Sequence, residues 1–295
     1  MATGMGDEPG AGAPADVFWS LAIELPRRAR GALTQRLAEL GFSSLEEQAA
    51  PRGVRVIIYS SERAALVAVE HALRAAPPSP ELRFELAPVP PGWELEWTRH
   101  LTPVELTPSI TLYPQRPTAP PRAGELYLEP AFAFGFGEHP STRLAARWLE
   151  AACHARPGAS VLDVGCGTGV LALVARRAGA GRVLGIDIAE PAVAAAGSNA
   201  ELNGIDGVVF WRAEVGALEE CFDRVVANIE APVLHALAPG IAARLGPGAE
   251  LALAGFIDEQ CAELAARFAT VGVQLTLREQ IDEWCLLAGA RATPI

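Results

Sequence analysis

The chain has 295 residues, of which 50% are apolar, and a formal net charge of −11. This length accommodates one α/β domain of about 150 to 200 residues and a second, smaller one. The acidic balance argues against a surface that tracks nucleic-acid phosphates, and it favours small-molecule chemistry or a basic macromolecular partner. Every basic residue among the 24 Lys and Arg is Arg, which excludes a lysine Schiff base and a Walker A phosphate loop.

The sequence carries no targeting feature. Its longest apolar runs, such as residues 54–59, have strand length and fall far short of the roughly 20 residues that a bilayer requires. Residues 1–15 are rich in Gly, Ala and Pro, so we expect a disordered lead rather than a signal peptide. The five cysteines lie far apart without a CxxC pair, which suits reduced thiols and argues against a structural zinc. We therefore expect a cytoplasmic protein without a metal or a membrane segment.

The first third of the chain predicts a small α+β domain over residues 16–88. Hydrophobic periodicity indicates strands at residues 18–25, 54–59 and 82–86 and helices at residues 30–40 and 62–76. A Pro-rich stretch, residues 89–121, follows and is expected to be a linker. It carries Trp93 and Trp97, which we expect to dock a short helix and pack the domains together.

Residues 122–295 predict an α/β domain with a doubly wound, mostly parallel, seven-stranded sheet. Strand patterns alternate with helical ones at residues 161–164, 183–186, 208–211, 224–227, 250–254, 273–278 and 284–288. Only a short turn separates the last two strands, so they are expected to form an antiparallel hairpin at the sheet edge.

The most informative segment is the sequence VLDVGCGTG at residues 161–169, followed by GID at residues 185–187. Gly165, Gly167 and Gly169 let the backbone approach a ligand, and the helix that follows offers unpaired N–H groups to an anionic group. Asp187, at the end of the next strand, is placed to accept from ribose hydroxyls. The unit predicts a site for a nucleoside-bearing cofactor, either a dinucleotide or S-adenosylmethionine. The GxGxG spacing departs from the dinucleotide pattern GxGxxG.

Three segments resemble those of a known family. Residues 131–142 (AFAFGFGEHPST, the first motif), residues 225–229 (VVANI) and residues 282–285 (DEWC) are similar to the segments AFGTGTHPTT, VVANI and EEWC of the ribosomal protein L11 methyltransferases. The resemblance extends from about Trp93 to Arg291, and the N-terminal domain is similar in layout more than in residues.

The resemblance implies a Rossmann-like class I methyltransferase fold that uses S-adenosylmethionine. It implies methyl transfer to amine groups of a protein, a lysine ε-amine, an α-amine or both. The substrate would be a large-subunit ribosomal protein of the L11 type, a basic partner that suits an acidic enzyme. No direct nucleic-acid binding is expected, because Asn228 is not followed by the Pro-Pro-aromatic sequence of base-methylating enzymes.

Carried over by motif, the family's cofactor contacts fall on Thr142, Gly165, Asp187 and Asn228, together with the other two loop glycines. Asn228 is also expected to orient the acceptor amine. Glu138 and Glu230, beside two of the motifs, are candidates to accept the amine's proton or to hold its ammonium form.

Four residues in or beside these motifs also have a structural interpretation. Thr142 would be a cap of a helix over residues 143–153, and Asn228 a turn residue at a strand end. His139 is either a loop histidine satisfied by backbone or a catalytic group. Cys166 is interpreted as a small space-filling side chain rather than a nucleophile.

The sequence departs from the family on the acceptor side of the site. Phe136 and Glu138 replace two threonines of the first motif, and Glu230 begins an EAP sequence where the family has Leu-Ala-Gly-Pro. Three functions therefore remain: a protein methyltransferase, an NAD(P)-dependent oxidoreductase, and an interaction protein that keeps the fold without turnover.

Overall fold

A computed structural model describes residues 19–40, 42, 46–51, 53–60, 62–89, 102–114, 117–128 and 139–291. The chain divides into two compact units, Met1–Glu96 and Trp97–Ile295, and each is described by itself. The expected disordered lead at residues 1–15 and the two tryptophans, Trp93 and Trp97, lie outside the described residues.

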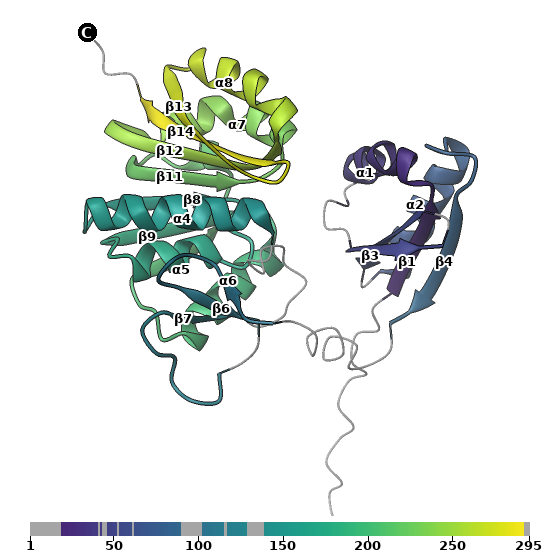
Figure 1. Ribbon diagram of the computed structural model, residues 1–295, viewed down its shortest axis with the longest axis horizontal. Coiled ribbons are helices and arrows are strands. Elements are labelled where there is room, and N and C mark those ends of the chain that lie inside the picture. The colour runs from purple at the N-terminus through teal and green to yellow at the C-terminus, as the bar shows by residue number, and fades with distance from the viewer. Residues whose placement is uncertain are drawn as a thin grey trace, which may run out of the picture. The chain divides into compact units, whose positions relative to one another are not determined.

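The N-terminal unit is a four-stranded antiparallel sheet with two helices (Figure 1). The strands pair in the order β2-β3-β1-β4, which with its helices makes a split βαβ, ferredoxin-like arrangement. Its elements are β1 (Trp19–Leu25), α1 (Arg30–Glu39), β2 (Glu46–Ala50), β3 (Gly53–Ser60), α2 (Arg63–Ala75) and β4 (Arg83–Pro88).

Alternation along β1 explains the core of this unit. Leu21, Ile23 and Leu25 are buried at every second position, as a strand with one covered face requires. Strand β2, which the sequence analysis did not predict, is built from EEQAA, residues with little strand preference. Its pairing with β3 along five positions explains why it is extended.

The region expected to be a linker differs from that prediction. Its described part carries strand β5 (Val104–Glu105) and strand β6 (Thr111–Tyr113), which form a small sheet with β7 (Glu125–Tyr127). Buried Glu150 of helix α4 (Pro140–Ala155) accepts hydrogen bonds from the hydroxyls of Thr107 (2.7 Å) and Ser109. These residues therefore belong to the second unit rather than to a free connection.

The second unit contains the predicted seven-stranded sheet, with strand order β10-β9-β8-β11-β12-β14-β13 (Figure 1). The first five strands are parallel, and β14 runs antiparallel to both of its neighbours, so the predicted terminal hairpin is confirmed. After α4 the elements are β8 (Ser160–Val164), α5 (Val170–Arg177), β9 (Arg182–Asp187), α6 (Glu190–Leu202), β10 (Val208–Arg212), β11 (Phe222–Asn228), α7 (Ala231–Ala243), β12 (Leu245–Ile257), α8 (Cys261–Ala269), β13 (Val273–Ile281) and β14 (Trp284–Arg291).

Helices cover both faces of this sheet, so its central strands are buried on both sides. The sequences of these strands are therefore mostly apolar without alternation. One core cluster joins α4 and α5 to one face of the sheet, with Val161 of β8 among its members. The other joins α7 and α8 to the opposite face, with Leu162 of β8 among its members. Successive residues of β8 thus pack against helices on opposite faces of the sheet.

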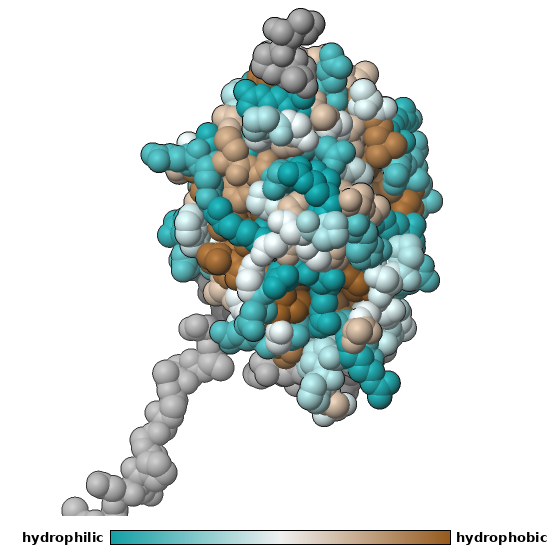
Figure 2. All heavy atoms as spheres, turned by 90° about the vertical axis from the view of Figure 1, so that its left-hand side faces the viewer, coloured by the Kyte–Doolittle hydropathy of each residue, from teal (hydrophilic) through white to brown (hydrophobic). Residues whose placement is uncertain are grey.

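The outer surface is mixed in polarity. In Figure 2, hydrophilic side chains separate the apolar ones into small patches on the face that is shown. Among the described residues, no helix combines the length and the apolar character that a membrane crossing requires.

Candidate cofactor and active site

Three sequence segments meet at the edge of the sheet that is formed by the carboxyl ends of its parallel strands. Gly165 follows β8, Asp187 ends β9 and Asn228 ends β11, and these three parallel strands are neighbours. The strand order reverses between β8 and β11, which is where open α/β sheets bind their ligands. Topology alone therefore brings the predicted site residues together.

The glycine loop, residues 165–169, has the left-handed backbone that its glycines permit. Gly165, Gly167 and Gly169 have φ angles of 72°, 52° and 79°. A Cβ at position 165 would lie 2.6 Å from Cγ2 of Ile229, so packing within the protein already requires glycine there. Gly165 is therefore required by internal packing as well as by the space that a ligand needs.

Asp163 lies on β8, two residues before the glycine loop, and the sequence pattern predicts no role for it. The side chain is buried, and its Oδ2 accepts a 3.1 Å hydrogen bond from the N–H of Ala172, one of the free donors in the first turn of α5. Its Oδ1 is buried, and no described residue donates a hydrogen bond to it. Burial raises the pKa of this carboxyl to about 7, opposed by the Ala172 hydrogen bond and reinforced by the charge of Asp187.

Asp187 keeps acceptor capacity for a ligand. Its Oδ2 accepts from the N–H of Gly167 and its Oδ1 from the N–H of Ala189, both at 3.0 Å. An ionised carboxylate has about four lone-pair sites, so roughly half remain for other donors. The two backbone bonds fix the carboxylate against the glycine loop, as a binding group requires.

Thr142 and Asn228 are in direct contact. Nδ2 of Asn228 donates a 3.1 Å hydrogen bond to Oγ1 of Thr142, which is fully buried in the first turn of α4. Oδ1 of Asn228 is buried and has no hydrogen-bond partner within the part of the chain that the structure describes. The alternative interpretation of Thr142 as a helix cap is wrong, because α4 begins at Pro140 and its N-cap residue is His139.

His139 lies beside the DEWC segment. Its Nδ1 contacts Oγ of Ser141 at 2.7 Å, and its ring meets the ring of Trp284 edge-on at 4.2 Å between centroids. Burial lowers the pKa of this imidazole, and the charge of Glu283 acts in the opposite direction. The first motif and the DEWC segment, remote in sequence, thus meet near the start of α4.

Of the two acidic candidates the structure describes only Glu230, and it also describes Cys166. Glu230 is exposed at the N-cap of α7, directly after Ile229, and its side chain does not cap that helix. Glu138 and Phe136 lie outside the described residues. Cys166 is buried, and burial raises the pKa of its thiol, which opposes a nucleophilic thiolate.

The fold brings together two cysteines that are separated in sequence. Ligand atoms of Asp258, Cys261 and Cys285 lie within 4.8 Å of one another in the described part of the chain. Arg278 donates to the Asp258 carboxylate, which supplies a positive charge there without a metal. Burial raises the pKa of the Cys261 thiol to about 12, which opposes the thiolate form that binds metals. The absence of a metal remains a prediction.

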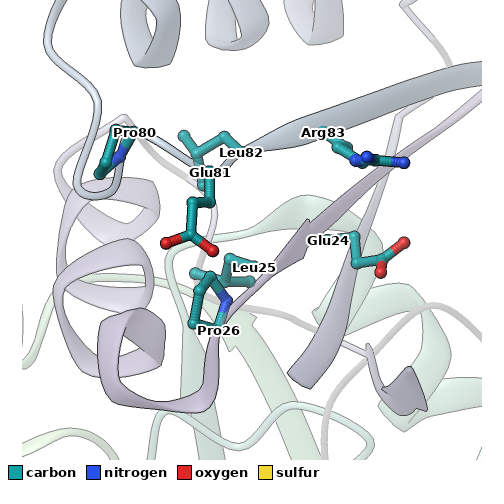
Figure 3. Close-up of a pocket in the computed structure, with 7 residues that line it drawn as sticks. All are labelled: Glu24, Leu25, Pro26, Pro80, Glu81, Leu82 and Arg83. Atoms are coloured by element: carbon teal, nitrogen blue, oxygen red, sulfur yellow. The ribbon is translucent and has the colours of Figure 1, made fainter. Parts of the chain in front are cut away.

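A surface pocket belongs to the N-terminal unit rather than to this edge of the sheet. Figure 3 shows it between the end of β1 and the turn before β4, with the Glu81 carboxylate pointing toward Pro26. Glu24 and Arg83 lie opposite each other on paired strands at its rim. The pocket therefore offers both signs of charge.

Comparison with known proteins agrees with this geometry. The family model of the ribosomal protein L11 methyltransferases (PrmA) matches residues 19–292. The L11 methyltransferase of Burkholderia pseudomallei strain 668 is 34% identical over 311 residues, covering 93% of this chain and 98% of that protein. The enzyme of Ralstonia pickettii strain 12J is 40% identical over 205 residues, covering 68% and 67%.

A solved structure agrees as well. The ribosomal protein L11 methylase of Lactobacillus delbrueckii subsp. bulgaricus superposes with a TM-score of 0.60 at 28% identity, over 65% of this chain and all of that one. The sheet order with its antiparallel β14 and the glycine loop are those of a class I methyltransferase, and the family match makes S-adenosylmethionine its cofactor. More specifically, the chain belongs to the ribosomal protein L11 methyltransferase family. This assignment decides between the two cofactor classes that the glycine loop left open.

Proposed function

We propose that this methyltransferase transfers methyl groups to amine groups of ribosomal protein L11, at lysine ε-amines, the α-amine or both. The family match supports this substrate, since the relatives carry the activity in their names. The structural observation that carries the proposal is a pair of buried acceptors, Oδ1 of Asp163 and Oδ1 of Asn228, that receive no hydrogen bond from the described residues. Asp163 lies on β8 and Asn228 ends β11, and these two parallel strands are paired with each other. Buried acceptors are normally bonded, so this pair fits a ligand rich in donors.

The cofactor would be held by Thr142, Asp187, Asn228 and the glycines at positions 165, 167 and 169. When bound, S-adenosylmethionine supplies a methyl group already activated on its sulfonium. The free lone pairs of Asp187 suit ribose hydroxyls, and the N–H groups at the start of α5 suit a carboxylate. The buried Oδ1 of Asp163 suits an ammonium group, which would replace the missing donor.

On the acceptor side, Asn228 has the right chemistry to orient an amine. Its Nδ2 is engaged by Thr142, which fixes the amide plane and leaves Oδ1 to accept from an N–H of the substrate. A lysine amine has an ordinary pKa of ~10.4, so it must lose a proton before it attacks. Glu138 and Glu230 are the proposed acceptors of that proton. If Glu138→Gln and Glu230→Gln each left the methylation rate and its pH profile unchanged, this role would be excluded.

The proposed N-terminal domain comprises residues 16–88. It would recruit the protein substrate, and the reaction would take place in the cytoplasm. Its pocket carries Glu24 and Arg83 at paired positions, which suits contact with a charged peptide rather than a nucleic acid. Charge reversal of both residues in the full chain should raise KM for the protein substrate and leave the Kd of S-adenosylmethionine unchanged. An unchanged KM would exclude this pocket from recruitment.

The decisive experiment is transfer of labelled methyl from S-adenosylmethionine to purified ribosomal protein L11, with Asp187→Ala as the inactive control. The chain contains no lysine, so the enzyme adds no lysine background of its own. Label on L11 lysines or its α-amine, located by mass spectrometry, is the expected result. Cofactor binding without label on L11 would overturn the proposal and favour the interaction protein that has lost turnover.

A further inference from the structure

Two buried amides stand at the C-terminal end of α6. Asn199 is 1% exposed and Asn203 is 4% exposed. A buried amide is costly unless its donors and acceptor are bonded, so its partners show what it holds in place. Neither residue belongs to the candidate site described above.

Asn199 holds the glycine loop. Its Nδ2 donates a 3.0 Å hydrogen bond to the carbonyl oxygen of Thr168, which lies between Gly167 and Gly169 and is fully buried. Helix α6 also packs directly on the loop, since a Cβ at Gly169 would lie 2.9 Å from Cβ of Ala196. The position of the loop therefore depends on this helix.

Asn203 holds strand β7. Its Oδ1 accepts from the N–H of Tyr127 at 2.8 Å, and its Nδ2 donates to the carbonyl of Tyr127 at 2.6 Å. Both backbone groups of Tyr127 are thus paired as a neighbouring strand would pair them. The same Nδ2 donates to the backbone carbonyl of Asn199 at 2.7 Å, which ties the Asn203 side chain to the last turn of α6.

Contacts fix the chain just before the first motif and the last residues of the motif itself. Just before it, Tyr127 is bonded to Asn203 and the N–H of Leu128 donates to the carbonyl of Tyr113 at 3.0 Å. At its C-terminal end, His139 caps α4 and Thr142 bonds Asn228. Strand β7, which precedes the first motif, and the glycine loop are therefore both attached to one end of α6.

We propose that Asn199 and Asn203 are positioning residues that set the glycine loop and strand β7, which leads to the first motif, at a fixed separation. This rests on the proposed function, in which the loop holds the methyl donor and the first motif borders the acceptor. In-line displacement is sensitive to placement, since a shift of about 1 Å can lower a rate about 100-fold. Asn199 acts on the donor side and Asn203 on the acceptor side.

The first test is a pair of near-isosteric substitutions in the full chain. Asn199→Leu should raise the Kd of S-adenosylmethionine about tenfold and change KM for the protein substrate less than twofold. Asn203→Leu should lower kcat/KM for the protein substrate about tenfold and leave the cofactor Kd within twofold. Glu201→Leu, an exposed position on the same helix, is the matched control. If both variants changed the cofactor Kd and the kinetics with the protein substrate to the same extent, the two amides would have only a structural role and the proposal would be overturned.

The second test uses the unaltered protein and so does not depend on the variants folding. Hydrogen exchange is followed by mass spectrometry with and without S-adenosylmethionine, in peptides that cover residues 163–172 and residues 120–128. The N–H of Tyr127 reports the Asn203 bond directly. Protection of both peptides is expected. Protection of the loop peptide alone would overturn the inference, whereas protection of neither would count against the cofactor site itself.

Discussion

Asn228 and Thr142, 86 residues apart in sequence, are joined by a 3.1 Å hydrogen bond between Nδ2 and Oγ1. The bond links the end of β11 to the first turn of α4, and it orients the free Oδ1 of Asn228. Two segments that the sequence analysis treated as separate motifs therefore act as one unit.

Replacement of Thr142 by valine, which keeps the shape and removes the hydroxyl, should leave the Asn228 amide without its acceptor. We expect kcat/KM to fall about tenfold, since an unmade buried hydrogen bond costs about 1–3 kcal/mol. Thr142→Ser keeps the hydroxyl and should retain most of the activity. Steady-state kinetics of both variants provide the check, and wild-type behaviour of the valine variant would contradict the prediction.

The Asp163 carboxyl predicts a pH dependence of stability in the ligand-free protein. Its pKa is raised from 3.8 to about 7 by burial, so between these values the folded state binds more protons than the unfolded state. Stability attributable to this group is therefore present at low pH and is lost as pH rises from about 4 to about 7. Urea unfolding across this range should show the loss, and Asp163→Asn should remove that component.

The same carboxyl predicts proton release when the cofactor binds. S-adenosylmethionine is cationic at its sulfonium and ammonium groups, so it favours the ionised form of Asp163. Its affinity should rise with pH up to about pH 7, by at most about tenfold per unit. Calorimetry in two buffers of different ionisation enthalpy measures the released proton. A pH-independent Kd in the unaltered protein would contradict this linkage.

Gly165→Ala should destabilise the fold through two separate causes. The residue has a φ of 72°, which costs about 1–2 kcal/mol for a residue with a Cβ, and the added atom would meet Cγ2 of Ile229 at 2.6 Å. A second change, Ile229→Ala, should relieve the clash and recover part of the loss measured by denaturant unfolding. Gly197→Ala is the control, because its Cβ would meet no atom within 4 Å in helix α6.

Glu150 should matter for stability rather than chemistry. It accepts from the hydroxyls of Thr107 and Ser109, so Glu150→Ala removes the attachment of the β5–β6 turn to α4. We expect a loss of about 1–3 kcal/mol and a fall in Tm of several degrees. Calorimetry of this variant and of Glu201→Ala, an exposed acid on α6, checks the assignment. Equal melting temperatures of the two variants would contradict it.

Strong local patterns made the seven-stranded sheet predictable. Strands such as β8 are apolar on both faces, and the short turn before β14 permits only a hairpin. The sequence did not reveal β2, whose residues lack strand preference and are held by pairing with β3. The strands β5 and β6 have two and three residues, too short for periodicity to show.

The candidate site was predictable where a motif fixes the backbone and not where a contact depends on tertiary structure. The placement of Gly165, Asp187 and Asn228 at adjacent strand ends follows from the order of the elements. The free oxygen of Asp163 and the loop contact of Asn199 arise only once α5 and α6 are packed. No spacing rule in one sequence indicates such contacts.

The place of β14 between β12 and β13 bears on biosynthesis. Strand β14 leaves the ribosome after both of the strands that it lies between, so β12 lacks this partner until residues 284–291 emerge. Until then β12, whose residues 251–254 are fully buried in the finished fold, exposes an apolar strand that other chains can pair with. Nascent chains, and chains that terminate before residue 284, are therefore expected to aggregate or to require a chaperone, whereas β14 protects β12 once it is made.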